Sequence, residues 1–362
     1  MNEFLRTPLC DLFGIEYPII QAGMGHIARA DLCAAVSNAG GLGVIGASGM
    51  EADELREEIR RVRQLTDRPF GVDLILPANI PEGDREERVE LPPVPDWLER
   101  LRAEHGISEA PDPVMRVSGT LIRRQVQVIL DEKVPVFASG LGNPAWLVPD
   151  AHAQGMKVIA VVGNVKNARR VAAGGADLVV AQGYDGGGHT GRIGTMSLVP
   201  QVVDAVRPTL VAAAGGIADG RGLVAALALG AAGVWVGTRF GATVEARSHV
   251  AYKDAIVGAA DEDVIISKGY TGKTCRVIRN RFTEEWEKSG LTALPMPLQG
   301  MWIGRSTHIA ARERGITALG SMPAGQGSGL ISEIKPAGEV VQDIMAEAQA
   351  VFEQIGVPVP RR

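Results

Sequence analysis

The stretch TLVAAAGGIADGRGLVAALALGAAGVWVGTRF (residues 209–240) contains two apolar runs, 209–216 and 233–240, joined by a helical segment. Runs that are apolar at every position are typical of strands buried on both faces. Two such strands with a helix between them form a βαβ unit, in which the strands are parallel. The stretch therefore predicts a parallel sheet covered by helices.

The same alternation extends upstream through the first two-thirds of the chain. Eight apolar runs occur in all, separated by crossover segments long enough for a helix, and eight such units close naturally into a (β/α)8 TIM barrel. A doubly wound open sheet is the alternative, which the count of eight and the lack of an early G-x-G-x-x-G disfavour. The predicted strands are 18–24, 41–47, 70–76, 134–140, 157–163, 178–183, 209–216 and 233–240.

Two segments interrupt this repeat. Residues 77–118, rich in proline and charge, form an insertion after the third strand, which is either a lid over the active site or a solvated surface excursion. Residues 241–316 are predicted to be helical with interruptions. We therefore expect a barrel made of 1–240 and 317–362, with 241–316 as a small helical subdomain.

Composition narrows the class of protein. The chain has 362 residues, 46% of them hydrophobic, and a net charge of −5 without a basic run, which disfavours binding to nucleic acid or to an anionic membrane. No stretch reaches the roughly 18 apolar residues of a membrane span, and the N-terminus lacks a signal-peptide pattern. The three cysteines form no C-x-x-C pair, so we predict no metal site. A cytoplasmic protein is expected.

The chemistry of a (β/α)8 barrel lies where its strands end. The seventh strand ends in Gly215 and Gly216, and the eighth in Gly237 and Thr238. Glycine lets a backbone N–H approach an anion closely, and the loops after these two strands are the usual phosphate site of the fold. We predict a phosphate-binding site here; the alternative is that the glycines only turn the chain.

The sixth strand leads into AQGYDGGGHTGRIG (181–194). Three consecutive glycines before His189 give a backbone that can lie against a flat ring. A histidine beside the phosphate loops can act as a general base on a carbon acid or orient an anionic substrate, although a lone histidine is usually structural. Gln182, at the end of the strand, could hydrogen-bond a ring edge.

Several of these motifs occur together in one known family. QAGMG (21–25), AQGYDGGGHTG (181–191), AAGGIADG (213–220) and GVWVGTRF (233–240) resemble the nitronate monooxygenase family, formerly called 2-nitropropane dioxygenases. The resemblance continues through TGKTCRVIRNRFTEEW (271–286) and MPAGQGSGLI (322–331) and so covers nearly the whole chain. The ordered set is far more specific than any single motif.

The resemblance implies an FMN-dependent TIM-barrel oxidoreductase with a small helical subdomain after the eighth strand. His189 matches the catalytic histidine of the family. By the same matching, Gly23 and Met24 would line the flavin ring. The remaining FMN contacts implied are Gln182, Gly187 and Gly188, with Gly215, Gly216, Gly237 and Thr238 at the phosphate.

The chain also departs from the family pattern. Asp73 stands where the F-G-V-N motif has asparagine, and a carboxylate near the flavin would change the local charge. Asp185 and Gly186 replace the usual glutamate and alanine. His26, just after QAGMG, is either a second polar group in the substrate pocket or a surface residue.

The leading functional hypothesis is oxidation of a small molecule, an alkyl nitronate, by O2 to a carbonyl compound and nitrite. The nearest alternative is an NAD(P)H-dependent reductase of enoyl thioesters (on acyl carrier protein or CoA) or of quinones, in which NAD(P)H need only stack on FMN. A second alternative is a non-redox barrel enzyme that binds phosphate through the same loops. A homodimer is one assembly that the chain could form.

Overall fold

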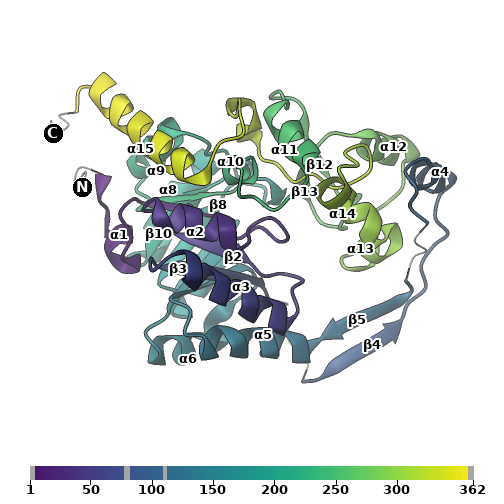
Figure 1. Cartoon of the computed structure of the whole chain (residues 1–362), viewed down its shortest axis with the longest axis horizontal. Coiled ribbons are helices and arrows are strands. Elements are labelled where there is room, and N and C mark those ends of the chain that lie inside the picture. Colours follow the sequence, from purple (N-terminus) through teal and green to yellow (C-terminus); the bar gives the residue numbers. More distant parts are fainter. Residues whose placement is uncertain (1–4, 77–81, 109–111, 358–362) are drawn as a thin grey trace.

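The computed structural model describes residues 5–76, 82–108 and 112–357. Its centre is a sheet of eight parallel strands that neighbour one another in chain order, with helices on the outside (Figure 1). Each predicted strand coincides with one of these eight. They are β1 (Ile19–Gln21), β2 (Gly43–Gly46), β3 (Phe70–Ile75), β6 (Val136–Leu141), β7 (Lys157–Val162), β8 (Leu178–Gln182), β10 (Leu210–Ala214) and β11 (Gly233–Val236).

The first and last strands close the sheet on itself. β11 pairs with β1, with Ile20 opposite Trp235. On its other side β1 reaches β2 through one parallel bridge, in which the Gln21 N–H donates to the Leu42 C=O and the Leu42 N–H donates to the Ile19 C=O, each at 2.9 Å. The TIM-barrel prediction is thus confirmed, and the open doubly wound sheet is wrong.

Helices cover the outer face of the barrel. The last helix packs against α9 and α2 (Figure 1), and Gly220 permits this approach because a Cβ there would collide with the Ala348 backbone nitrogen. Among the described residues, no helix is both long and apolar enough to cross a membrane. The helices of the barrel are α1 (Pro8–Phe13), α2 (Ala30–Asn38), α3 (Ala52–Leu65), α5 (Gly119–Asp131), α6 (Val148–Ala153), α7 (Val165–Ala173), α8 (Thr195–Val206), α9 (Gly220–Ala228), α10 (Thr238–Gly241) and α15 (Ala337–Gln354). Two 3-10 turns accompany them, η2 (Pro144–Trp146) and η3 (Gln326–Leu330).

The insertion after β3 forms a ribbon and a helix that reach away from the barrel (Figure 1). β4 (Asp84–Arg88) pairs antiparallel with β5 (Val114–Ser118), and α4 (Asp96–Glu104) lies between them in the chain. The Leu98 and Leu101 side chains of α4 are buried against Phe282 and Trp302 beyond the barrel. Residues 77–81 and 109–111 of the insertion lie outside the described residues, and a lid function stays a prediction.

The segment 241–316, expected to be helical with interruptions, contains helices and also a pair of short strands. Runs of only four residues, VIIS and CRVI, cannot be assigned by periodicity, and here they pair as antiparallel strands. The second strand also pairs with β9 (Gly188–His189), which attaches the segment to the loop after β8. The elements are α11 (Val250–Val257), β12 (Val264–Ser267), β13 (Cys275–Ile278), α12 (Arg281–Ser289), α13 (Leu298–Ile303) and α14 (Arg305–Arg314). Whether the segment behaves as a separate domain stays a prediction.

Candidate active site

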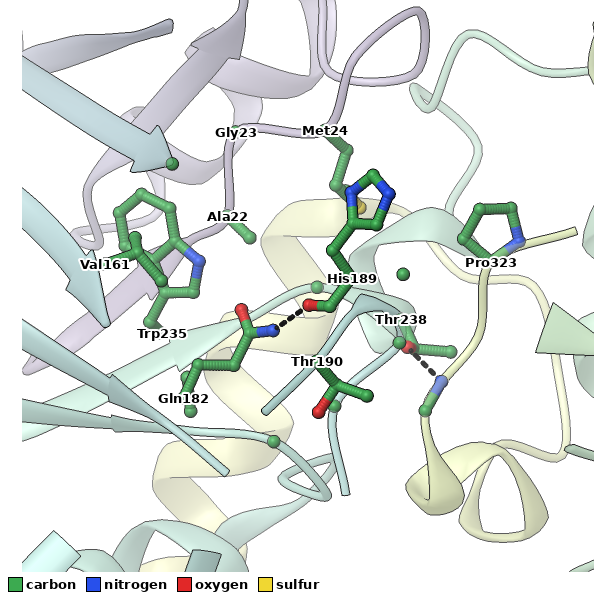
Figure 2. A pocket seen from close by; sticks show the side chains of 18 of the residues that line it. Ala22, Gly23, Met24, Val161, Gln182, His189, Thr190, Trp235, Thr238 and Pro323 are labelled. Carbon is green, nitrogen blue, oxygen red and sulfur yellow. Dashed lines mark hydrogen bonds between the residues drawn. The ribbon is translucent and has the colours of Figure 1, made fainter. Parts of the chain in front are cut away.

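A cavity of about 570 Å³ opens at the carboxyl ends of the barrel strands, and Figure 2 shows part of its lining. Small interior side chains such as Ala22 and Ala214 leave this end of the barrel hollow, beside the ring of Trp235. Eleven of the twelve predicted site residues line the cavity, all except His26. The eleven are Gly23, Met24, Asp73, Gln182, Gly187, Gly188, His189, Gly215, Gly216, Gly237 and Thr238.

The loops after β10 and β11 present free N–H groups to the cavity. Gly215 and Gly216 have φ angles of 99° and 75°, in the left-handed region that favours glycine. The N–H groups of Gly215, Gly216 and Gly237 donate to no acceptor among the described residues. Because an unpaired N–H inside a protein is costly, three of them at one edge fit an anion such as a phosphate.

The hydroxyl of Thr238 completes this edge. Its Oγ1 accepts a hydrogen bond from the Gly325 N–H at 3.0 Å, drawn as a dashed line in Figure 2, so its own hydrogen remains free to be donated. Gly325 and Gly327 line the cavity as well. Sequence reasoning did not single them out as site residues, although MPAGQGSGLI was the signal that contained them.

His189 is held by the backbone around it. β9 pairs with β13, with His189 opposite Cys275, and the His189 C=O accepts a hydrogen bond from Gln182 Nε2 at 2.8 Å (Figure 2). Gln182 was expected to reach a ring edge; here its amide nitrogen fixes the histidine loop, and a contact with flavin stays a prediction. The imidazole Nε2 lies 3.1 Å from Oγ1 of Thr271.

The charge state of His189 follows from its surroundings. Burial lowers the pKa of the half-buried imidazole, and the nearby Lys273 ammonium lowers it further. Both effects favour the neutral form, which is the form that can accept a proton. His189 is thus an uncharged side chain at the cavity wall near neutral pH.

The burial of Asp73 opposes the negative charge that its residue type suggested. The side chain is only 5% exposed, and no cation pairs with it among the described residues. Burial raises its pKa well above the ordinary value, opposed only by a backbone hydrogen bond from Gly140. Its Oδ1 is buried without a hydrogen-bond partner. Burial therefore favours the protonated carboxyl over the carboxylate, and in that form Asp73 would resemble the asparagine amide of the family in charge.

Two basic side chains also line the cavity. Lys273, in the turn before β13, and Arg312, on α14, both line the cavity. Burial lowers the pKa of Arg312, but a guanidinium stays charged at neutral pH. Within the described part of the chain, no carboxylate pairs with Arg312, and its Nε is buried without a hydrogen-bond partner. Sequence reasoning singled out neither residue as a site residue, although the motif TGKTCRVIRNRFTEEW contains Lys273.

Two other residues noted in the sequence have local roles. His26 adopts a φ of 67° in the turn after QAGMG and does not line the cavity. Burial, together with the Arg312, Arg305 and Arg29 guanidinium groups, lowers the pKa of His26 to about 4. Asp185 Oδ2 accepts the Thr195 N–H at 2.9 Å at the start of α8, which is a helix-capping contact.

The fold and the cavity define a (β/α)8-barrel enzyme with free backbone N–H groups after its last two strands. Residues 6–347 match the family model described as Nitronate monooxygenase. The chain therefore belongs to the nitronate monooxygenase family and is an oxidoreductase. This membership sets aside the non-redox phosphate-binding alternative.

Three proteins illustrate the relationship. The "Probable nitronate monooxygenase" of Staphylococcus aureus strain Newman is 34% identical, over 96% of this chain and 99% of that protein. A solved nitroalkane oxidase from Streptomyces ansochromogenes has a TM-score of 0.81 at 31% identity, covering 96% of this chain and 99% of that one. FabK from Thermotoga maritima has a TM-score of 0.79 at 37% identity, covering 97% and 98%.

Proposed function

We propose that this protein uses FMN to oxidise alkyl nitronates with O2, giving a carbonyl compound and nitrite. The observation that carries this proposal is the charge of the cavity. Lys273 and Arg312 contribute two cations, and burial favours the protonated form of Asp73, the single acidic side chain among the described lining residues. A positive cavity favours an anionic substrate, and a nitronate is an anion.

FMN is the flavin that best suits the phosphate edge. Three N–H groups and the Thr238 hydroxyl supply about as many donors as one terminal phosphate can accept. When bound, the flavin would be the electron acceptor of the oxidation. In this proposal Gly23 and Met24 line the ring, while Gln182, Gly187 and Gly188 lie at the loop that faces it. Protein denaturation should release FMN; release of FAD would contradict the assignment.

His189 has two roles open to it in this reaction. With a neutral nitroalkane, it takes the proton from the carbon next to the nitro group, which turns the substrate into the nitronate. With a nitronate supplied directly, no proton needs to be removed, and His189 then serves only to orient the anion. The difference between these two substrates therefore reports on the base function.

The deciding experiment is anaerobic mixing of the flavin-loaded protein with an alkyl nitronate, with NADH and with NADPH, in separate runs. We expect the nitronate to change the visible flavin spectrum, and nitrite to appear once O2 is admitted. A protein reduced by NADH or NADPH and unaffected by the nitronate would instead be a reductase of enoyl thioesters or quinones. Such a result would overturn the proposed function.

A further inference from the structure

The turn between β12 and β13 contacts His189, in the loop that follows β8. It contains Thr271, Gly272 and Lys273, and Gly272 has a φ of 78°. A Cβ on Gly272 would collide with the Leu294 C=O, so this close turn requires glycine. Because β13 also pairs with β9, the turn and His189 are fixed relative to each other by backbone hydrogen bonds.

Thr271 Oγ1 lies within hydrogen-bond distance of three groups. It is 3.1 Å from His189 Nε2, 3.3 Å from the Lys273 C=O and 3.3 Å from the Lys273 backbone nitrogen. A hydroxyl has one hydrogen to donate and two lone pairs to accept with. The Lys273 N–H can only donate and its C=O can only accept. All three contacts are satisfied when the hydroxyl donates to the C=O and accepts from the N–H and from a hydrogen on Nε2.

The opposite arrangement satisfies fewer groups. If the Thr271 hydroxyl donated to Nε2, the Lys273 C=O would lose this donor, and the neutral ring would carry its hydrogen on Nδ1. Nδ1 would then have no lone pair for a proton. In the described part of the chain, Nδ1 has no hydrogen-bond partner, so nothing else competes for it.

We propose that Thr271 is a positioning residue that holds His189 in the tautomer with hydrogen on Nε2, so that Nδ1 is the atom that accepts the substrate proton. The role rests on the proposed function. The C–H bond of a neutral nitroalkane breaks, its proton moves to Nδ1, and its electron pair stays on the substrate as the nitronate. The Nε2–H bond to Thr271 is the same before and after the transfer, so no partner needs to rearrange.

The test uses the flavin-loaded protein with ¹⁵N-labelled histidine. Wild-type protein and Thr271→Ser, which keeps the hydroxyl, should show the His189 resonances of the Nε2–H tautomer by NMR. Thr271→Val, which removes the hydroxyl at nearly constant shape, should show a mixture of tautomers. Thr317→Val is the matched control, since its hydroxyl makes no hydrogen bond with the described residues and it does not line the cavity.

Turnover supplies the second readout. Loss of one hydrogen bond between neutral groups predicts a fall of about 3- to 10-fold in kcat for a neutral nitroalkane in Thr271→Val. Nitronate turnover should stay unchanged, because that substrate needs no base. The proposal is overturned by hydrogen on Nδ1 in the wild-type protein, or by a serine variant that behaves like the valine variant. A wild-type protein that turns over neither substrate contradicts the proposed function, while the NMR spectra still decide the tautomer.

Discussion

The cavity has two walls that present different groups to a ligand: a barrel wall of backbone N–H groups and a basic wall of cationic side chains. At the ends of β10 and β11, the ligand meets backbone N–H groups of Gly215, Gly216 and Gly237. Elsewhere in the lining it meets the side chains of Lys273 and Arg312, which come from the segment after the last barrel strand. Backbone donors persist through most substitutions, whereas side chains change with a single one. The barrel wall therefore suits an invariant cofactor group, and the basic wall suits selection of the substrate.

The largest effect is expected at His189, which lies between the two walls. His189→Asn should keep FMN bound, because the phosphate edge is untouched. Loss of a positioned base should lower turnover of a neutral nitroalkane by about 10²- to 10⁴-fold, and turnover of the nitronate much less. Steady-state assays with both substrates measure this. Equal losses on the two substrates would show that His189 only orients the anion.

The barrel wall is tested with Gly215→Ala. A Cβ there would lie 2.9 Å from Thr195 Oγ1 and 3.0 Å from the Gly186 nitrogen, at a φ that alanine disfavours. The loop should shift and its N–H groups should move off the phosphate, weakening FMN binding by about 10²-fold for a loss near 3 kcal/mol. Fluorescence titration of the apoprotein measures the Kd. Gly194→Ala, where a Cβ meets nothing within 4 Å, is the control.

The basic wall is tested with Arg312→Met. Removing a hydrogen bond from a charged group costs about 1.5–3 kcal/mol, so KM for the nitronate should rise by about one to two decades, with FMN affinity unchanged. Arg305→Met on the same helix removes an exposed charge and should have little effect. A Kd for FMN that rises together with KM would mean that Arg312 binds the cofactor, and the contrast between the walls would fail.

A smaller effect concerns pH. The Lys273 ammonium lowers the pKa of His189, so Lys273→Gln should let this pKa rise toward its ordinary value. The base form would then be lost at a higher pH. We expect the acid limb of the pH profile for a neutral nitroalkane to move upward in the variant, as measured by kcat/KM against pH. An unmoved limb would place the ammonium too far away to act on the ring.

The smallest effect is expected at Asp73. Because burial favours the protonated carboxyl, we expect Asp73→Asn to exchange one neutral group for another. The reduction potential of the bound flavin should change little, as measured by redox titration at neutral pH. A large positive shift would show that Asp73 is ionised beside the flavin, and the cavity would then carry one positive charge fewer than proposed.

The barrel wall could be predicted from sequence because its signals are local. The apolar run 209–216 predicts a strand, and the glycines at its end predict where a backbone approaches a ligand. Arg312 lies in no motif, and TGKTCRVIRNRFTEEW contains Thr271 without indicating its contact, since the approach of Thr271 to His189 depends on how β13 pairs with β9. The pKa shift of Asp73 could not be predicted from the sequence for a related reason. Residue type gives the ordinary pKa, but burial among distant segments decides the actual one.

The pairing of β9 with β13 also bears on the order in which the protein matures on the ribosome. The barrel has all its strands once Val236 has been made, yet the partner strand of His189 begins only at Cys275. The loop that carries Gly325 comes later still. A nascent chain can therefore contain all the strands of its barrel before the residues that complete the site have been synthesised. We expect a chain ended after residue 241 to lack activity even where its strands assemble.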